Sequence, residues 1–446
     1  MNMKKGWIAA AMLLIASGPL LARDVAIRAG TLHTMNGAPI TDGVVLIRGG
    51  KIAAVGPAST VQIPAGVEVL EAAVATPGLV DARTVVGLAG YLNQPHDQDQ
   101  LESSAPIQPQ LRAFDAYNPR EPLVRWLREL GVTTLHTGHG TGTLVSGQTM
   151  IVKTRGNSVE AAMVKPVAMV AAELGPGAMA ERGKSPGTRA KQMAMLRAML
   201  IKAREYRGGT RGTDTRGQGG HGDATPVQSP EDAWAQEMGL APEPAPTAKG
   251  RGGESVSGSG RDLEMEALRA VLDRRVPLMV TAWQAQDIMS ALRLRQEFGI
   301  DVVIDGGAES YLVIDALKQA GVPVILHPPM ARQSGELENA SFTTPARLRE
   351  AGIPFALQSG YEGYVPKTRV VLWEAAIAAA HGLPREAALA SITLDAARIL
   401  GIERRVGSLE VGKDGDVALF SGDPLEYTSR VTGVVIEGEI VSRATR

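Results

Sequence analysis

A repeated pattern in the middle of the chain limits the folds that this sequence can adopt: an amphipathic helix ends in glycine, and a short apolar run follows at once. Each glycine stands where a helix needs a left-handed residue, and each run is typical of a parallel strand buried on both faces. Copies of the pattern lie at 129–135, 297–304, 319–326 and 350–357, and the run 276–280 after an expected helix at 263–275 is a copy without the glycine. Because helices that alternate with buried strands form βα units, we predict the α/β class and a (β/α)8 barrel.

The two chain ends have a different pattern. Residues 24–76 and 406–446 alternate between apolar and polar residues, and glycine-rich turns separate the runs, as in strands. We therefore expect a small β-sandwich built from residues 23–76 and 406–446, with the barrel over 77–405. Between about 207 and 260, small, polar and charged residues replace the apolar period, so this segment is interpreted as a flexible insertion.

The first residues have the features of a secretory signal. Lys4 and Lys5 precede an apolar run over 7–16, and Leu20-Leu21-Ala22 offers a cleavage site. We predict a signal peptide over 1–22 and a periplasmic or secreted protein. An uncleaved membrane anchor is the alternative, although the run is short for a membrane span. No second long apolar stretch follows, so the rest of the chain is expected to have no stable membrane span.

Composition excludes two kinds of site. The chain has no cysteine, which excludes disulfides and thiolate metal ligands. The formal net charge is -1, and acidic and basic residues are interspersed. Because nucleic-acid binding needs a basic face, no nucleic-acid partner is expected.

Several motifs carry a family resemblance. The segment Pro77-Gly78-Leu79-Val80-Asp81 resembles the end of the first barrel strand in the amidohydrolase superfamily, and residues 412–417 are similar to the glycine-and-aspartate signature near the C-terminus of that family. Segments 111–119 and 147–154 resemble the imidazolonepropionase-like amidohydrolases. The resemblance covers the chain from about residue 24 to its end. It implies a barrel with a small composite β domain and, in most members, a metal-dependent hydrolysis of carbon–nitrogen bonds other than peptide bonds.

The residues at the family's metal-ligand positions do not suit a metal. After the first strand, where the family has His-x-His, this chain has Arg83 and Val85. The fifth strand ends in Thr281-Ala282-Trp283 in place of a histidine-containing segment. Gly306 stands where the histidine of the sixth strand is expected, and Gly360 where the aspartate of the eighth strand is expected. Zinc needs imidazole, thiolate or carboxylate donors. We therefore predict a divergent member with no metal, no cofactor and no catalytic residues.

A relocated metal site is the competing hypothesis. Three histidines and two carboxylates follow other expected strands, and together they make a ligand set for one divalent metal such as zinc; they are His136, His139, His327, Glu173 and Asp305. On the alternative interpretation the histidines are loop residues bonded to backbone or water.

Arg83 supports a separate hypothesis about a ligand pocket. Its guanidinium stands in place of a metal ligand and can supply positive charge to Asp305, to Glu173 or to the carboxylate of a ligand. Trp283 adds a flat apolar wall, and Tyr361 follows the eighth strand. An ordinary ion pair of Arg83 is the alternative.

Two functions follow from these observations. The first is a non-catalytic protein that binds a small molecule or serves as a partner subunit. We expect a homodimer, or a hetero-oligomer with an active homologue. The second is an active hydrolase of amide or dipeptide-like substrates that uses an atypical metal site.

Overall fold

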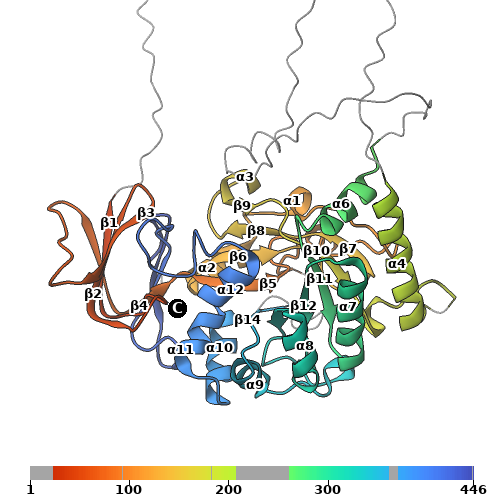
Figure 1. Ribbon diagram of the computed structural model, residues 1–446. Coiled ribbons are helices and arrows are strands. Elements are labelled where there is room, and N and C mark those ends of the chain that lie inside the picture. Colours follow the sequence, from red (N-terminus) through yellow and green to blue (C-terminus); the bar gives the residue numbers. More distant parts are fainter. Residues whose placement is uncertain (1–23, 93, 182, 207–260, 361–369, 444) are drawn as a thin grey trace, which may run out of the picture. The chain divides into compact units, whose positions relative to one another are not determined.

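The structure of the protein is a computed structural model, and it describes residues 24–92, 94–181, 183–206, 261–360, 370–443 and 445–446. The described residues before 207 and after 262 belong to one compact unit (Figure 1). The predicted signal peptide at 1–22, the predicted insertion at 207–260 and the pocket candidate Tyr361 lie outside the described residues.

Both chain ends contribute to one seven-stranded sheet, in the spatial order β17-β16-β15-β4-β1-β2-β3. Its strands are β1 (Val25–Leu32), β2 (Ile40–Arg48), β3 (Lys51–Pro57), β4 (Glu68–Pro77), β15 (Val417–Phe420), β16 (Val431–Ile436) and β17 (Glu439–Ser442). β15 pairs antiparallel with β4, and Val417 stands opposite Pro77. Alternate apolar residues of both ends, such as Ile27 and Leu419, share one buried cluster. The predicted sandwich is thus one continuous sheet in its hydrogen bonding.

The central strands form two sheets. The first has six strands in the order β14-β13-β12-β11-β10-β7, and the second has four in the order β5-β6-β8-β9. Their bounds are β5 (Leu79–Thr84), β6 (Val132–Thr137), β7 (Val145–Gln148), β8 (Met150–Lys153), β9 (Met163–Lys165), β10 (Val170–Glu173), β11 (Leu278–Ala282), β12 (Val302–Gly306), β13 (Val324–Leu326) and β14 (Phe355–Leu357). Within these sheets β5 and β6 pair in parallel, as do β10 through β14. The two sheets meet where the backbone N–H of Gly360 donates to the carbonyl oxygen of Arg83 at 3.0 Å.

One segment departs from the predicted eight parallel strands. β7 runs antiparallel to β10, and β8 runs antiparallel to β6. The residue between these two strands, Thr149, exchanges backbone hydrogen bonds with Met169 and Ala168 at 2.9 and 2.7 Å. The connection from β6 to β8, residues 138–149, contains β7 and no helix, whereas the crossover between parallel strands is usually a helix. The described residues therefore have an α/β arrangement in which a closed parallel barrel is not seen.

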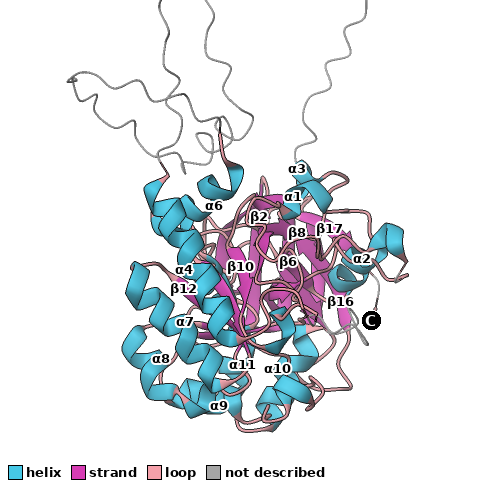
Figure 2. Ribbon diagram, turned by 90° about the vertical axis from the view of Figure 1, so that its right-hand side faces the viewer, coloured by secondary structure: helices cyan, strands magenta, loops and turns pink. Residues whose placement is uncertain are grey.

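Helices lie outside the central strands (Figure 2). They are α1 (Ala113–Ala116), α2 (Pro122–Glu129), α3 (Val159–Ala162), α4 (Arg189–Glu205), α6 (Leu263–Leu272), α7 (Ala285–Phe298), α8 (Ile314–Ala320), α9 (Thr344–Glu350), α10 (Val371–Ala380), α11 (Arg385–Ser391) and α12 (Leu394–Leu400). Within the described residues, four short 3-10 helices span Pro95–Asp97, Pro176–Ala178, Ser310–Leu312 and Gly335–Leu337. Gly299 and Gly321 end α7 and α8 in the left-handed conformation, with φ of 67° and 63°, so the predicted role of these glycines is confirmed.

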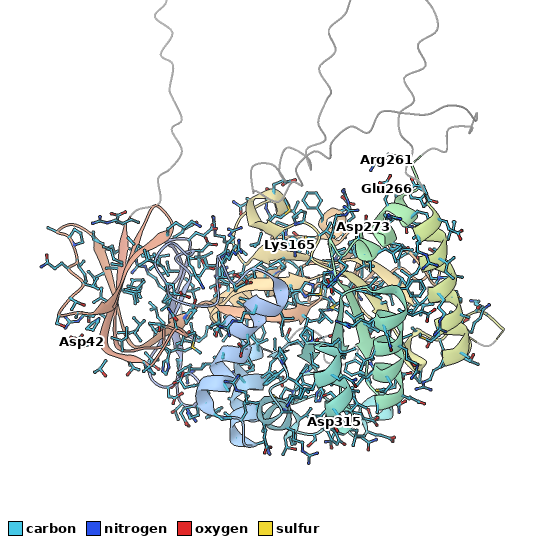
Figure 3. All side chains as sticks on the ribbon, viewed as in Figure 1. Asp42, Lys165, Arg261, Glu266, Asp273 and Asp315 are labelled. Carbon is cyan, nitrogen blue, oxygen red and sulfur yellow. The ribbon has the colours of Figure 1, made fainter. Side chains whose placement is uncertain are left out.

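Charged side chains lie mainly on the outside, as Asp42 on the terminal sheet and Asp315 on α8 illustrate (Figure 3). A buried exception joins a central strand to the C-terminal part of the chain. Lys153 at the end of β8 contacts Asp414 at 3.1 Å and also pairs with Asp416. In the part of the chain that the structure describes, no helix has the length and apolar character needed to cross a membrane.

Candidate functional site

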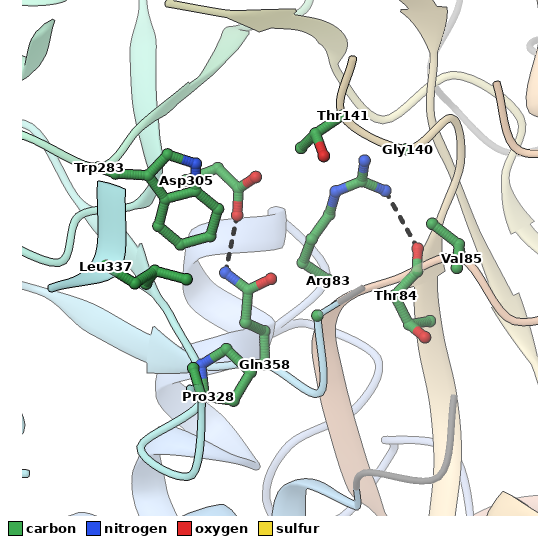
Figure 4. Close-up of a pocket in the computed structure, with 12 residues that line it drawn as sticks. Arg83, Thr84, Val85, Gly140, Thr141, Trp283, Asp305, Pro328, Leu337 and Gln358 are labelled. Carbon is green, nitrogen blue, oxygen red and sulfur yellow. Dashed lines mark hydrogen bonds between the residues drawn. The ribbon is translucent and has the colours of Figure 1, made fainter. Parts of the chain in front are cut away.

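A pocket lies at the carboxyl ends of the central parallel strands, which is where α/β barrels carry their chemistry. It encloses about 510 Å³, counting the solvent at its open mouth. Its lining residues lie in the last residues of β5 and β12 or in the segments after β5, β6, β11, β13 and β14 (Figure 4); they are Arg83, Thr84, Val85, Gly140, Thr141, Trp283, Asp305, Pro328, Ala331, Leu337, Gln358 and Gly360.

Strand alternation explains how polar groups reach this pocket. One buried apolar cluster takes a side chain from each of four neighbouring strands, namely Met279, Val303, Ile325 and Ala356. Side chains two residues further along a strand point to the same face. These next residues are Thr281, Asp305, His327 and Gln358, and all four are buried. A polar layer therefore lies directly beyond an apolar one.

Arg83 brings a buried positive charge to the pocket. Its side chain is 4% exposed, and its guanidinium donates to the backbone carbonyl of Thr84 at 3.0 Å and to that of His139. Burial lowers the pKa of Arg83, while the charges of Asp305 and Asp81 oppose this shift. No carboxylate among the described residues lies within salt-bridge distance of the guanidinium, so the predicted ion pair of Arg83 with Asp305 or Glu173 is not formed.

Asp305 lies across the pocket from Arg83 (Figure 4). One carboxylate oxygen accepts a hydrogen bond from the Thr281 hydroxyl and the other from the Gln358 amide, both at 2.7 Å. The Gln358 amide also donates to the carbonyl of Ile325 at 3.0 Å. These neutral donors fix the direction of the carboxylate without neutralising its charge.

Asp81 holds the backbone beside Arg83 in place through hydrogen bonds. It accepts hydrogen bonds from the backbone N–H groups of Arg83 and Ser359, at 3.2 and 3.0 Å, and from the Ser359 hydroxyl. Burial raises the pKa of Asp81 to about 6, while the Ser359 and Arg83 contacts oppose the shift. The carboxylate thus ties the end of β5 to the chain after β14.

The family's metal-ligand positions offer no metal donors here. Arg83 and Val85 follow the first strand, Trp283 follows the fifth and Gly360 follows the eighth, and a cation, two apolar groups and a missing side chain cannot bind zinc. In the ranges that the structure describes, no three histidine, aspartate or glutamate side chains stand close enough together to hold a metal ion. The residues present therefore do not fit the metal that the family implies.

The histidines of the alternative metal site do not line the pocket. Both ring nitrogens of His136 are used, because one contacts the carbonyl of Ala82 at 2.7 Å and the other the hydroxyl of Thr149 at 2.6 Å. Burial, and next the charge of Arg83, lower the pKa of His136 to about 3 and that of His139 to about 4. Both rings are therefore neutral near pH 7. His327 is buried in the polar layer and contacts the carbonyl of Pro328 at 2.8 Å.

Glu173 is likewise outside the pocket lining. It ends β10, and its carboxyl accepts a hydrogen bond from the backbone N–H of Gly142 at 2.5 Å. Burial raises the pKa of Glu173 to about 8, and the nearby charges of Glu336 and Asp305 add to the shift. A carboxyl group with this pKa is mostly protonated at pH 7, which is a poor state for a metal ligand.

Comparison with known proteins identifies the family. The amidohydrolase family model matches residues 284–442. The crystal structure of an amidohydrolase from Thermotoga maritima MSB8 superposes with a TM-score of 0.79 at 27% sequence identity, over 94% of this chain and 100% of that chain. The chain belongs to the amidohydrolase superfamily. The resemblance seen in the sequence motifs is thereby confirmed.

Curated relatives agree with membership of the superfamily. The amidohydrolase tasK of Hapsidospora irregularis is 25% identical over 422 residues, which are 89% of this chain and 39% of tasK. An imidazolonepropionase of Symbiobacterium thermophilum is 33% identical over 108 residues, 24% of this chain and 25% of that protein. The chain thus spans well under half the length of tasK, and its match to the imidazolonepropionase covers a quarter of the latter.

Some site residues were not found from the superfamily motifs. Thr281 was noted only as part of a strand end that lacks a ligand, and Gln358 was not singled out, yet both orient Asp305. Their place at strand ends was a usable signal. Leu337 and Thr141 lie in loops, and only the folded chain brings them to the pocket.

Proposed function

We propose that this chain is a non-catalytic member of the amidohydrolase superfamily, and that it binds a small molecule in the pocket at the strand ends. One observation carries the proposal: a buried guanidinium, Arg83, occupies the position of the family's first metal ligand. A fixed positive charge at this point repels a divalent cation, and it attracts an anionic group instead. We also propose that the two central sheets derive from the eight-stranded barrel of the superfamily.

Hydrolysis in this superfamily depends on a metal that makes hydroxide near neutral pH and polarises the carbonyl. The described residues near Arg83 provide no group of three metal donors. The pKa values of His136 and His139 are lowered to about 3 and about 4, so these two rings are weak bases near pH 7. These facts support binding without turnover. The competing function is an active hydrolase of amide or dipeptide-like substrates.

Elemental analysis of the full chain separates the two functions. The protein is purified, incubated with zinc, manganese or iron(II), dialysed, and measured by inductively coupled plasma mass spectrometry. We expect less than about one metal ion per ten chains, because the residues that the structure describes offer no donor set. A stoichiometric metal that survives dialysis would favour the hydrolase and overturn the proposal.

The expected location and assembly are part of the proposal. We propose that residues 1–22 direct export, and that the mature chain forms a homodimer or assembles with an active homologue. Fractionation of cells that express the tagged chain tests the first point, since a cytoplasmic product of full length would contradict it. Light scattering of the purified protein tests self-association, and co-purification from the native host tests the hetero-oligomer.

A further inference from the structure

The pocket holds two opposite charges that do not pair with each other. The guanidinium of Arg83 donates to two backbone carbonyls, those of Thr84 and His139, and neither acceptor is charged. Guanidinium has more N–H donors than these two bonds use. Asp305 receives hydrogen bonds only from the neutral Thr281 and Gln358 side chains in the described structure.

The remaining walls are largely apolar. Trp283 and Leu337 lie on the Asp305 side of the pocket, and Val85 lies near Thr84 on the other side (Figure 4). Gly306 lies so close under Trp283 that a Cβ there would come within 2.8 Å of the ring, so the glycine allows the ring to occupy this place. The space that the centre of a water-sized sphere can occupy in the pocket is about 60 Å³, so only a small ligand fits.

Electrostatics limits the charge of a suitable ligand. A simple anion that binds Arg83 brings a second negative charge close to Asp305 in a poorly solvated space, and a simple cation that binds Asp305 meets Arg83 in the same way. A molecule that carries both charges can pair with Arg83 and Asp305 at once, because each of its ionic groups then gains a charge-assisted hydrogen bond.

We propose that the pocket binds a small zwitterion with an apolar side chain, whose carboxylate is held by Arg83, whose ammonium is held by Asp305, and whose side chain packs on Trp283. Free α-amino acids and short peptides both have this chemistry. The inference rests on the proposed function, because it requires a pocket that holds a ligand without a metal.

Isothermal titration calorimetry of the full chain tests the charge requirement. The probes are L-leucine, glycyl-L-leucine, 4-methylpentanoate and 3-methylbutylamine, which share one side chain and differ in their charges. We expect at least one of the two zwitterions to bind. Each singly charged analogue should bind at least about tenfold more weakly, which corresponds to about 1.4 kcal/mol per lost ionic contact. The comparison of L-leucine with glycyl-L-leucine distinguishes a free amino acid from a peptide.

Two variants test whether Arg83 binds the carboxylate of the ligand and Asp305 its ammonium group. In Arg83→Met the zwitterion should lose its advantage over 3-methylbutylamine, and in Asp305→Asn it should lose its advantage over 4-methylpentanoate. Arg83→Lys keeps the charge without the planar fork, and it is the second variant if Arg83→Met does not fold. Arg28→Met is the matched control, because Arg28 is an exposed arginine on the terminal sheet, and it should leave binding unchanged.

The outcomes separate this inference from the proposed function. If neither zwitterion binds at millimolar concentration, or if a singly charged analogue binds as tightly as the tighter zwitterion, the zwitterion inference is wrong. A metal-free protein leaves the proposed function intact in that case. A stoichiometric metal in the elemental analysis would instead overturn the proposed function.

Discussion

Replacement of Glu173 by glutamine should change how the stability of the protein depends on pH. The carboxyl of Glu173 is 3% exposed, and its pKa is raised to about 8 from a value of 4.5 for a free side chain. Between these pH values the unfolded chain releases the proton while the folded chain keeps it. The folded state therefore binds more protons, and its stability falls as the pH rises from 4.5 to 8. The full effect is about 4–5 kcal/mol, at about 1.4 kcal/mol per pH unit.

The variant Glu173→Gln removes this titration and keeps an oxygen that accepts from Gly142. Urea unfolding, followed by tryptophan fluorescence from pH 5 to pH 9, measures the free energy of unfolding of variant and parent. We expect the variant to gain about 4 kcal/mol relative to the parent over this range, with the gain complete above pH 8. Glu181→Gln is the control, because the side chain of Glu181 is 84% exposed. A stability difference between Glu173→Gln and the parent that stays within about 1 kcal/mol at every pH would refute the reasoning.

Two further variants test a buried ion pair away from the pocket and a close contact beside it. Lys153→Met should lower the free energy of unfolding by about 3–5 kcal/mol in urea unfolding, because it leaves the fully buried carboxylate of Asp414 without one of its partners. Gly306→Ala should lower the melting temperature and change the near-UV circular dichroism of Trp283, since the new methyl group would press on the ring.

Each of these variants has a matched control. Lys51 contacts the same carboxylate at 2.6 Å but is half exposed, so Lys51→Met should cost no more than about 1 kcal/mol. Gly321 has a φ of +63° with open space around it, so Gly321→Ala should show only the left-handed backbone cost of about 1–2 kcal/mol. If Lys51→Met lowers the free energy of unfolding as much as Lys153→Met, burial does not decide the size of the loss. If Gly321→Ala lowers stability as much as Gly306→Ala, the contact with the Trp283 ring does not decide it.

Local patterns predicted much of the fold. The sequence predicted the glycines that end α7 and α8 and the buried strands after them. A left-handed helix end and a doubly buried strand each require particular residue types. The antiparallel pairing of β7 with β10 and of β8 with β6 could not be predicted in this way. Their residues have ordinary strand character, and their direction depends on which partners the chain reaches after a short loop.

The candidate site divides in a similar way. Arg83, Trp283 and Asp305 were named from their places at strand ends, and all three line the pocket. His136 was named on the same argument, but both of its ring nitrogens turn to internal hydrogen bonds. Strand-end position states which edge of a sheet a residue occupies, and it does not state which neighbour its side chain contacts.

The amino-acid sequence alone determined the α/β class, the composite origin of the terminal sheet and the residue types at the positions where the family resemblance places metal ligands. Each depends on residue type at a known place along the chain. Tertiary structure alone decided that Arg83 and Asp305 face one pocket without pairing, and that Glu173 keeps its proton near neutral pH. Those properties arise from desolvation and from contacts between distant segments, which only the folded chain creates.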